Sequence, residues 1–449
     1  MFDQNCPKYV ILGGGVSALS LAWFLKKKNP NSQITLIEKK DCLGGWIQTD
    51  QIDSFLFERG PHSLRLSSFY KDVCLDLFND LNLSSKIIQI NSAYKKRFLA
   101  YDNKLHPISL NPLFILAPQN FFKILCPILK GILKKTNFEK KDPSIAEFFN
   151  HYFGKFITQK FVDPFVMGVK GGNIHELSLK SSFSLLHQLS NKKGPLLFHL
   201  IKHLKKNKAE LISFENGFSD LINGFKNKLD AQILLNENVT QLNLGLSSSV
   251  ITSNRELKAD HIFSTLPSYE LAKLLERHSI NNLNFLKNQK QVSYKVIYLG
   301  FSEKLNLPDS FGFISPSWSQ QQISGTIFDS KIFPSQEKGL SQTRLSLMIH
   351  EDSKIFNQTE EEIKMTILTE LQKLLKINLD PKVFVIQPLK KAISQYAIGH
   401  EEKLHLFKNE LKEKFPNFTF LGNSFYGLSV PACIYKGYEI ASHHSLITN

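Results

Sequence analysis

The chain has 449 residues, which suits two or three packed domains better than one simple core. Its 55 basic and 40 acidic residues leave a net charge of +15, which indicates an anionic partner. This partner could be a membrane surface, an acidic small molecule or nucleic acid, but the sequence has no nucleic-acid-binding motif. Five scattered cysteines without a C-x-x-C pair argue against a metal site and predict a reducing cytoplasm, and no signal peptide is visible.

The first elements read as a strand–helix–strand unit. Apolar runs predict a strand over 9–12, a helix over 17–28 and a second strand over 33–38. This order and spacing are typical of a parallel sheet. Phosphate groups bind at the N-terminus of such a helix, because its free N–H groups and its dipole favour anions.

The residues between these elements indicate a dinucleotide site. Gly13 permits a tight turn, Gly15 lets the backbone approach a pyrophosphate, and Ala18 stands where a third glycine usually packs the helix against the sheet. Glu38 is placed to accept hydrogen bonds from ribose hydroxyls and would repel a 2′-phosphate, which disfavours NADP. A glycine-rich turn in an unrelated α/β protein is the alternative.

A second series of small residues follows and favours FAD over NAD. It comprises "GGW" at 44–46 and "FERGPHSLR" at 57–65. An extended FAD needs backbone contacts well beyond its pyrophosphate, and Gly44, Gly45 and Gly60 permit that close approach. Each glycine alone is also compatible with an ordinary turn, so the prediction depends on their order along the chain.

The middle of the chain, 105–208, is predicted to be mostly helical and is strongly basic. Residues 86–141 hold 11 basic side chains against 2 acidic ones. Within them, apolar residues over 121–133 recur on one helical face, but prolines and lysines interrupt the stretch too often for a membrane-spanning helix. The pattern fits a helix on an anionic membrane surface, and equally a core helix under a solvated lysine face.

Strand patterns return later in the chain and predict a sheet that is built from both of its ends. They cover 232–244, 260–266, 291–301 and 344–349, and a further strand ends at Gly422. We therefore predict a mixed α/β fold: a Rossmann-like FAD-binding domain, a mixed-sheet substrate domain and a mostly helical, membrane-associating domain. The predicted limits are 1–90, 211–285 and 401–449 for FAD binding, 91–210 for the helical domain and 286–400 for the substrate domain.

Several longer blocks give the sequence a family resemblance. They include "FVDPFVMGVKGGNIHELSLKSSF", "ISQYAIGH" and "FLGNSFYGLSVPACIYKGYEIA". In these blocks, and nearly end to end, the chain resembles the FAD-dependent protoporphyrinogen oxidases of haem synthesis, within the amine-oxidase-like flavoproteins. It departs from the family pattern at Ser394, where a proline is common, and at Ala18.

The resemblance implies a set of residues that contact FAD through the turn, the second strand, the later glycines and the C-terminal block. These are Gly13, Gly15, Val16, Ser17, Ala18, Glu38, Lys39, Gly44, Gly45, Trp46, Gly60, Pro61, His62, Ser63, Val239, Gly422, Asn423 and Val430.

The resemblance also implies a substrate site. Arg97 matches an arginine that pairs with a porphyrinogen propionate, a role that suits the fixed fork of a guanidinium. Gly168 matches a backbone contact near a pyrrole, and the macrocycle is held by Phe311, Gly312, Ile314 and Met348. Arg97 and His62 are the candidate catalytic residues. Without the resemblance, Phe311 and Met348 read as core residues and Arg97 as part of a solvated basic run.

The implied reaction is the removal of six hydrogens from protoporphyrinogen IX by three hydride transfers to FAD, with oxygen as the acceptor. The alternatives are a coproporphyrinogen III oxidase, whose substrate has four propionates instead of two, a flavin amine oxidase and a non-enzymatic binding relative. We expect a cytoplasmic protein that is peripheral on the inner face of the cell membrane. We further expect a homodimer that hands its product over to ferrochelatase. We expect it to bind neither a metal nor nucleic acid.

Overall fold

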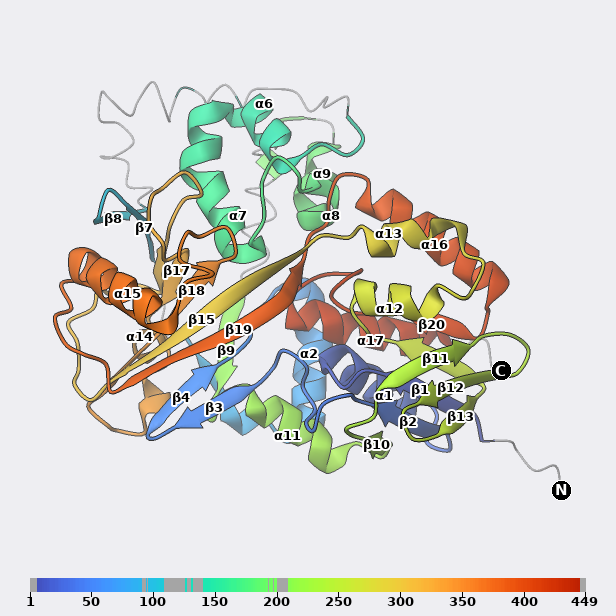
Figure 1. Cartoon of the computed structure of the whole chain (residues 1–449). Helices are drawn as coiled ribbons and strands as arrows, with labels where there is room; N and C mark the ends of the chain where they lie inside the picture. The colour runs from blue at the N-terminus through green and yellow to red at the C-terminus, as the bar shows by residue number, and fades with distance from the viewer. Residues whose placement is uncertain are drawn as a thin grey trace.

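A computed structural model describes residues 6–90, 94, 96–108, 126, 131, 140–192, 194–196, 198–199 and 209–444. The elements form a parallel-sheet region, a large second sheet and a helical region (Figure 1). The predicted mixed α/β fold is therefore confirmed. The predicted amphipathic segment 121–133 falls outside the described residues, apart from Cys126 and Gly131.

The parallel sheet has five strands in the order β10-β2-β1-β14-β20. Their bounds are Lys8–Leu12 for β1, Gln33–Ile37 for β2, Gln232–Leu234 for β10, His261–Ser264 for β14 and Phe418–Phe420 for β20. All neighbouring strands pair in parallel. Because β2 and β14 lie on opposite sides of β1, the strand order reverses there, and open α/β sheets bind ligands at such a point. The sheet draws on both ends of the chain, as predicted.

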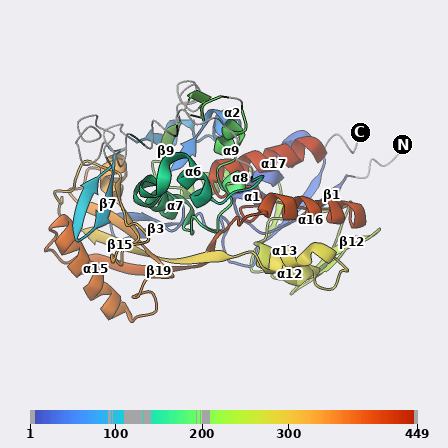
Figure 2. The same cartoon turned by 90° about the horizontal axis from the view of Figure 1, so that it is seen from above.

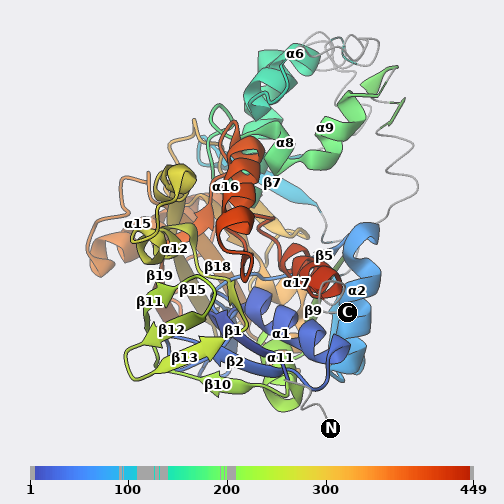
Figure 3. The same cartoon turned by 90° about the vertical axis from the view of Figure 1, so that its right-hand side faces the viewer.

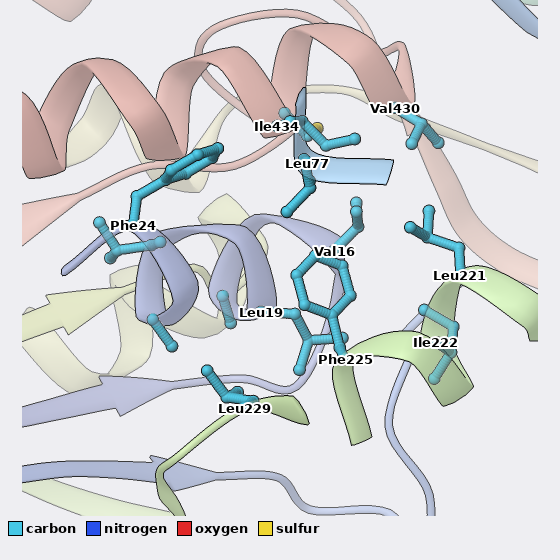
Figure 4. Close-up of a cluster of buried hydrophobic side chains, with 14 of the residues drawn as sticks. Val16, Leu19, Phe24, Leu77, Leu221, Ile222, Phe225, Leu229, Val430 and Ile434 are labelled. Atoms are coloured by element: carbon cyan, nitrogen blue, oxygen red, sulfur yellow. The ribbon is translucent and has the colours of Figure 1, made fainter. Parts of the chain in front are cut away.

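Both faces of this sheet are covered, since successive residues of β1 enter different cores. Tyr9 and Ile11 belong to the core under α1 and α17, whereas Val10 and Leu12 belong to the core under α12 and α16. Figure 4 shows the first core, where side chains of α1, α17, α11 and α2 meet. The bounds are Val16–Lys28 for α1, Ser68–Asp80 for α2, Ser219–Lys228 for α11, Ser268–Leu275 for α12, His400–Lys414 for α16 and Val430–His444 for α17.

The strand predicted over 232–244 is wrong in its continuity, because it consists of two strands in different sheets. After β10, Asn236 takes a left-handed conformation with φ of +55°. The backbone N–H groups of Asn236 and Glu237 then bind the carbonyls of Lys40 and Glu38. This turn carries the chain into an antiparallel sheet, whose strands are β11 (Val239–Asn243), β12 (Ser248–Thr252) and β13 (Glu256–Ala259).

The second large sheet has seven strands in the order β19-β15-β18-β17-β16-β7-β8, and only β16 and β7 pair in parallel. Its long strands β15 and β19 run side by side (Figure 2). The bounds are Arg97–Tyr101 for β7, Lys104–Pro107 for β8, Gln291–Phe301 for β15, Gly312–Ile314 for β16, Gly325–Ile327 for β17, Thr343–His350 for β18 and Val383–Ser394 for β19.

One face of this sheet is closed by helix α15, Glu360–Leu375. The helix begins with a capping box formed by Thr359 and Glu362. Its buried residues Ile363, Ile367 and Leu371 recur every four residues and pack on the sheet. The opposite face looks toward the helical region and the parallel sheet (Figure 1).

The helical region contains α6 (Ile145–Ile157), a π-helical turn (Thr158–Val162), α7 (Asp163–Lys170), α8 (Leu179–Ser182) and α9 (Ser184–Ser190). Figure 3 shows α6, α8 and α9 at one end of the molecule and β2 and β10 at the other. The helical prediction holds for the described part after 144 and is wrong at its start. Residues 105–107 instead complete the β7–β8 hairpin, whose Asp102–Asn103 turn has positive φ angles.

Four short strands link these regions. They are β3 (Thr49–Ile52), β4 (Phe55–Glu58), β5 (Leu64–Leu66) and β6 (Ile87–Gln89). Strand β3 pairs with β4. Both β5 and β6 pair with a further strand, β9 (Glu210–Phe214). None of the helices within the described ranges has the length and apolarity that crossing a bilayer requires.

Candidate active site

The carboxyl ends of three parallel strands meet around Thr265, a residue that the sequence interpretation missed. A side chain on Gly13, at φ of +98°, would place its Cβ 2.6 Å from the Thr265 hydroxyl. Gly422, at φ of +120°, lies against the Thr265 carbonyl on the other side. The Thr265 hydroxyl also donates to the carbonyl of Leu12 at 2.8 Å. Positive φ angles, together with these contacts to Thr265, therefore favour glycine at two of the predicted cofactor positions.

Glu38 lies at the end of β2 and is buried beside the glycine turn. Its Oε2 accepts from the N–H of Gly14 at 2.7 Å, and its Oε1 accepts from the N–H of Lys40 at 2.9 Å. Each carboxylate oxygen has a second lone pair, so both can still accept from hydroxyl groups. This is the acceptor pair that a ribose diol needs.

Open backbone surrounds the start of α1. A Cβ on Gly15 would meet no atom nearer than the Cα of Gly45 at 4.0 Å, and Gly15 pairs with Gly44 in a parallel bridge. No side chain caps α1, and its first turn holds no acidic residue. The N–H groups of this turn, including those of Ser17 and Ala18, are thus directed at a space that suits an anion.

The C-terminal block is held against this cradle by Tyr396, which the sequence interpretation did not single out. Its hydroxyl donates to the carbonyl of Asn423 at 2.5 Å and accepts from the N–H of Gly427 at 2.9 Å. Burial raises the pKa of Tyr396 well above its ordinary value, so the hydroxyl keeps its proton. The side chains of Val16 and Val430 pack in the core of Figure 4, which leaves their backbone groups for a cofactor.

The remaining predicted cofactor residues lie at the margins of the cradle. Gly60 is packed on Trp46, because a Cβ there would lie 2.2 Å from the Trp46 carbonyl oxygen. Lys39 is 54% exposed in its side chain and pairs with Glu270 at 3.6 Å. Val239 begins β11, two residues after the turn that binds the Glu38 carbonyl. Pro61 and Ser63 are half-buried on either side of His62.

His62 faces a carboxylate of the second sheet region. Its Nδ1 lies 3.0 Å from Oδ1 of Asp329, which begins helix α14 (Asp329–Ile332). Glu58 lies nearby and accepts from the N–H of Phe218 and the hydroxyl of Thr49. Burial raises the pKa of Glu58 to about 7. A buried polar cluster therefore joins the parallel-sheet region to the second sheet.

The predicted substrate residues share one face of the seven-stranded sheet. Paired residues of neighbouring strands project to the same side, and so do residues two apart along a strand. Arg97 pairs with Gly312, and Ile314 pairs with Gly325, which in turn pairs with Met348. The structure thus brings four of the predicted residues together on the face opposite α15: Arg97, Gly312, Ile314 and Met348.

Arg97 and Phe311 form one edge of this face. The Arg97 guanidinium carbon lies 4.2 Å from the centroid of the Phe311 ring, a cation–π contact. Burial lowers the pKa of Arg97 from its ordinary value, but an arginine stays charged at neutral pH. The site therefore offers a partly desolvated, oriented guanidinium beside an aromatic ring.

Helix α7 crosses the same face. A Cβ on Gly168 would lie 2.5 Å from Cδ1 of Ile314, so a larger residue at 168 would require the Ile314 side chain to move. Two residues further on, the half-buried Lys170 appears in no ion pair among the described residues. Burial lowers the pKa of its ammonium to about 8. Gly168 is thus brought to the predicted substrate face, with a poorly solvated cation nearby.

Comparison with known proteins identifies the chain. A model of the family described as "Flavin containing amine oxidoreductase" matches residues 17–443. The chain belongs to this family. As a family member it is an FAD-dependent oxidase, which confirms the predicted cofactor and enzyme class.

The relatives of this flavoprotein cover nearly its whole length. It is 24% identical to a coproporphyrinogen III oxidase of Staphylococcus aureus over 95% of this chain and 96% of the relative. It is 27% identical to a protoporphyrinogen oxidase of Bos taurus over 96% of this chain and 97% of the relative. A crystal structure from Exiguobacterium sp. 255-15 has a TM-score of 0.85 at 20% identity and covers 98% of this chain and 99% of its own, which shows the fold.

The cradle at the carboxyl edge fits FAD. Gly15 leaves free a space that a pyrophosphate would fill, and the start of α1 supplies N–H donors to it. Gly45 packs on Gly15, because a Cβ there would lie 3.2 Å from the Gly15 Cα. Glu38 would hold the ribose hydroxyls. The individual cofactor and substrate contacts stay predictions, although the structure brings most of these residues together.

Proposed function

We propose that this flavin oxidase converts protoporphyrinogen IX to protoporphyrin IX, with oxygen as the electron acceptor. The observation that carries the proposal is the sheet face on which Arg97, Gly312, Ile314 and Met348 lie in register under helix α7. Near-full-length similarity to the porphyrinogen oxidases described above supports it.

The side chains hold the ring and its charges. Arg97 binds one propionate, and its neighbour Phe311 keeps the guanidinium in place. The apolar side chains of Ile314 and Met348 contact the macrocycle and exclude water. When bound, FAD accepts two electrons at a time as a hydride, so the loss of six hydrogens takes three rounds. The protein's task is mainly to position the substrate.

His62 acts in this scheme through its position. Its Nδ1 is engaged with Asp329, and its buried Nε2 has no hydrogen-bond partner among the residues that the structure describes. An imidazole that is 5% exposed and bound to a carboxylate is better placed to hold the chain than to reach a large substrate. It would instead hold the segment from Gly60 to Ser63 beside the cofactor cradle.

Coproporphyrinogen III is the second candidate substrate. Coproporphyrinogen III oxidases of Staphylococcus aureus and Bacillus subtilis are each 24% identical to this chain. Their match supports the same reaction on a ring with four propionates, for which an additional cation beside Arg97 would be useful. Lys170 lies on helix α7 next to this face, and it forms no ion pair among the described residues.

A reductive half-reaction decides between these proposals. The purified flavoprotein is mixed anaerobically with protoporphyrinogen IX or coproporphyrinogen III, and the loss of flavin absorbance is followed. Faster bleaching by protoporphyrinogen IX supports the first proposal, and faster bleaching by coproporphyrinogen III replaces it with the second. No bleaching by either, in a protein whose flavin is reduced by dithionite, would overturn both.

We also propose that the helical region rests on an anionic membrane in the cytoplasm. The net charge of +15 supports this, as do exposed large apolar side chains in this region. These side chains are Phe165, Val169, Leu185 and Phe198. Sedimentation with phosphatidylglycerol liposomes at low salt should carry the protein down, and a protein that stays in the supernatant contradicts the proposal. A homodimer and hand-over to ferrochelatase stay predictions.

A further inference from the structure

Gly325 occupies the middle of the proposed substrate face. It lies on β17, directly between Ile314 of β16 and Met348 of β18 in the strand register. Its two neighbours in this row carry long apolar side chains that are half-buried, whereas Gly325 has none. The row therefore contains a gap between two side chains, and Gly325 is buried at the floor of that gap.

The backbone does not require glycine at this position. The φ angle of Gly325 lies outside the left-handed region, and a Cβ there would meet only the carbonyl oxygen of Phe313 at 3.5 Å, an ordinary contact. Gly312 on the next strand differs, because its φ is +149° and its Cβ would lie 1.9 Å from the Thr326 carbonyl oxygen. Glycine weakens a strand, since it packs no side chain and loses more conformational freedom on folding. The fold thus gives no reason for glycine at 325.

The gap is enclosed on its other sides by parts of the proposed site. Gly168 of α7 packs on Ile314 at one side of the row. At the other side, Met348 packs against the buried cluster that contains Val296 and Tyr298. Any side chain at 325 would project from the same sheet face, between these two walls.

We propose that Gly325 is a specificity-determining residue, whose missing side chain leaves the space in which a pyrrole ring of the porphyrinogen lies between Ile314 and Met348. This inference rests on the proposed function. A porphyrinogen has saturated meso carbons and is puckered, so it is thicker than the planar porphyrin that it becomes. A methyl or isopropyl group at 325 should therefore exclude the substrate more strongly than the product.

The test is a size series at one position. Gly325→Ala and Gly325→Val are purified with their flavin, and KM and kcat are measured for the porphyrinogen that reduces the wild-type protein. Gly325→Ala should raise KM about tenfold, Gly325→Val should raise it further, and affinity for the planar product should fall less than affinity for the substrate. Gly245→Ala is the control, because a Cβ there meets no atom within 4 Å and the residue lies in a turn of another sheet.

A second change separates lost space from damage to the fold. Gly325→Val combined with Met348→Ala should recover part of the lost affinity, because the smaller side chain restores room beside the valine. Flavin content and dithionite reduction should match the wild type in every variant, and Tm should not fall in Gly325→Ala or Gly325→Val, because glycine weakens a strand. If Gly325→Val fails these checks, Gly325→Ala alone decides the question.

Each outcome then has a distinct meaning. An unchanged KM in a correctly folded Gly325→Ala variant, and in Gly325→Val where it folds, overturns the inference and leaves the proposed function intact. A wild-type protein that neither porphyrinogen reduces overturns the proposed function itself. A raised KM that the Met348→Ala change does not relieve also contradicts the inference, because space would not be the cause.

Discussion

His62 and Asp329 are bound to each other, with 3.0 Å between Nδ1 and Oδ1, although 267 residues separate them in the chain. His62 is 7% exposed and Asp329 is 6% exposed. When the imidazole is neutral, the carboxylate keeps its proton on Nδ1. The contact ties the segment after β4 to helix α14, and thereby joins the cofactor cradle to the substrate sheet.

Breaking this contact should destabilise the protein from either side. His62→Ala and Asp329→Ala should each lower the free energy of unfolding by about 1–3 kcal/mol, because the remaining partner is left buried and unpaired. Asp329→Asn should cost less, since its amide oxygen still accepts from Nδ1. Urea unfolding measures these changes. The free energy of unfolding should fall less in the double variant than the sum of its falls in the two single variants, and simple additivity would show that the residues do not stabilise each other.

Glu38 should control FAD affinity. Glu38→Gln replaces one oxygen by an NH₂ group, which cannot accept from a ribose hydroxyl and also faces a backbone N–H. We expect FAD to bind about 10- to 100-fold more weakly, as loss of a charge-assisted hydrogen bond implies. Reconstitution of the apoprotein, followed by flavin fluorescence, measures this change.

Asp41→Asn is the matched control for Glu38→Gln. Asp41 lies three residues further on and is exposed, so the variant loses the same charge near the cradle. Its FAD affinity should stay close to that of the wild type. Equal losses in both variants would mean that general charge, and not the position of the Glu38 carboxylate, holds the cofactor.

Arg97 should act on substrate binding more than on the flavin. Arg97→Lys keeps the charge but loses the bidentate fork, and Arg97→Met removes both. We expect KM for the porphyrinogen to rise about tenfold for lysine and about 100-fold for methionine, with flavin absorbance unchanged. Steady-state kinetics with purified variants measure the effect, and an unchanged KM for Arg97→Met would remove Arg97 from the substrate site.

The sequence predicts the parts of this site that depend on local patterns. The strand over 291–301 matches β15, and the turn at Gly13 together with Glu38 matches the cradle, because alternation and glycine spacing act over a few residues. The strand over 232–244 fails because an alternating pattern does not reveal a left-handed Asn236 that redirects the chain.

The residues that the sequence does not predict are held by contacts between distant segments. Thr265 donates to Leu12 across 253 residues, and Tyr396 holds the loop that contains Asn423 and Gly427. A single sequence carries no signal that pairs such positions. The serine and threonine at 264–265, within the strand predicted over 260–266, and the tyrosine of "ISQYAIGH" stand in the sequence, but nothing local assigns them partners.

Glu58 should make stability fall as pH rises through the weakly acidic range. Burial raises its pKa to about 7 in the folded protein, against an ordinary value of 4.5. Between these values the folded state keeps a proton that the unfolded state has lost, so raising the pH costs up to about 3 kcal/mol of stability. Burial likewise raises the pKa of Glu370 to about 7, so this residue also makes the free energy of unfolding fall as the pH rises.

Glu58→Gln should therefore flatten this dependence without removing it. Urea unfolding of both proteins at several pH values from 4.5 to 8 would measure the difference in slope, which should be up to about 1.4 kcal/mol per pH unit between the two pKa values of Glu58. The contribution of Glu370, and the opposing one of His261, whose pKa burial lowers to about 3, are the same in both proteins. Glutamine can still accept from the N–H of Phe218, so the fold should persist. A variant with the full wild-type slope would show that Glu58 does not titrate in this range.

Lys170 should destabilise the protein at neutral pH. Burial lowers the pKa of its ammonium to about 8 from 10.5, so below pH 8 the folded state holds a poorly solvated charge. Lys170→Met keeps the length of the side chain and removes that charge, and it should raise the free energy of unfolding at pH 7 by up to about 3 kcal/mol. The gain should disappear as the pH rises from about 8 to 10.5, because the wild-type lysine is then neutral in the folded state.

Lys226→Met is the control for Lys170→Met, because Lys226 is exposed on α11 and its loss should change stability by less than about 0.5 kcal/mol. Thermal unfolding of both variants at pH 7 and pH 10 separates the two cases. If Lys170→Met were less stable than the wild type at pH 7, the contact of the ammonium with the Phe183 ring, whose centroid is 5.8 Å away, would have to outweigh the cost of its burial. A stabilised variant that binds the porphyrinogen more weakly would mean that this lysine is kept for its ligand at the expense of the fold.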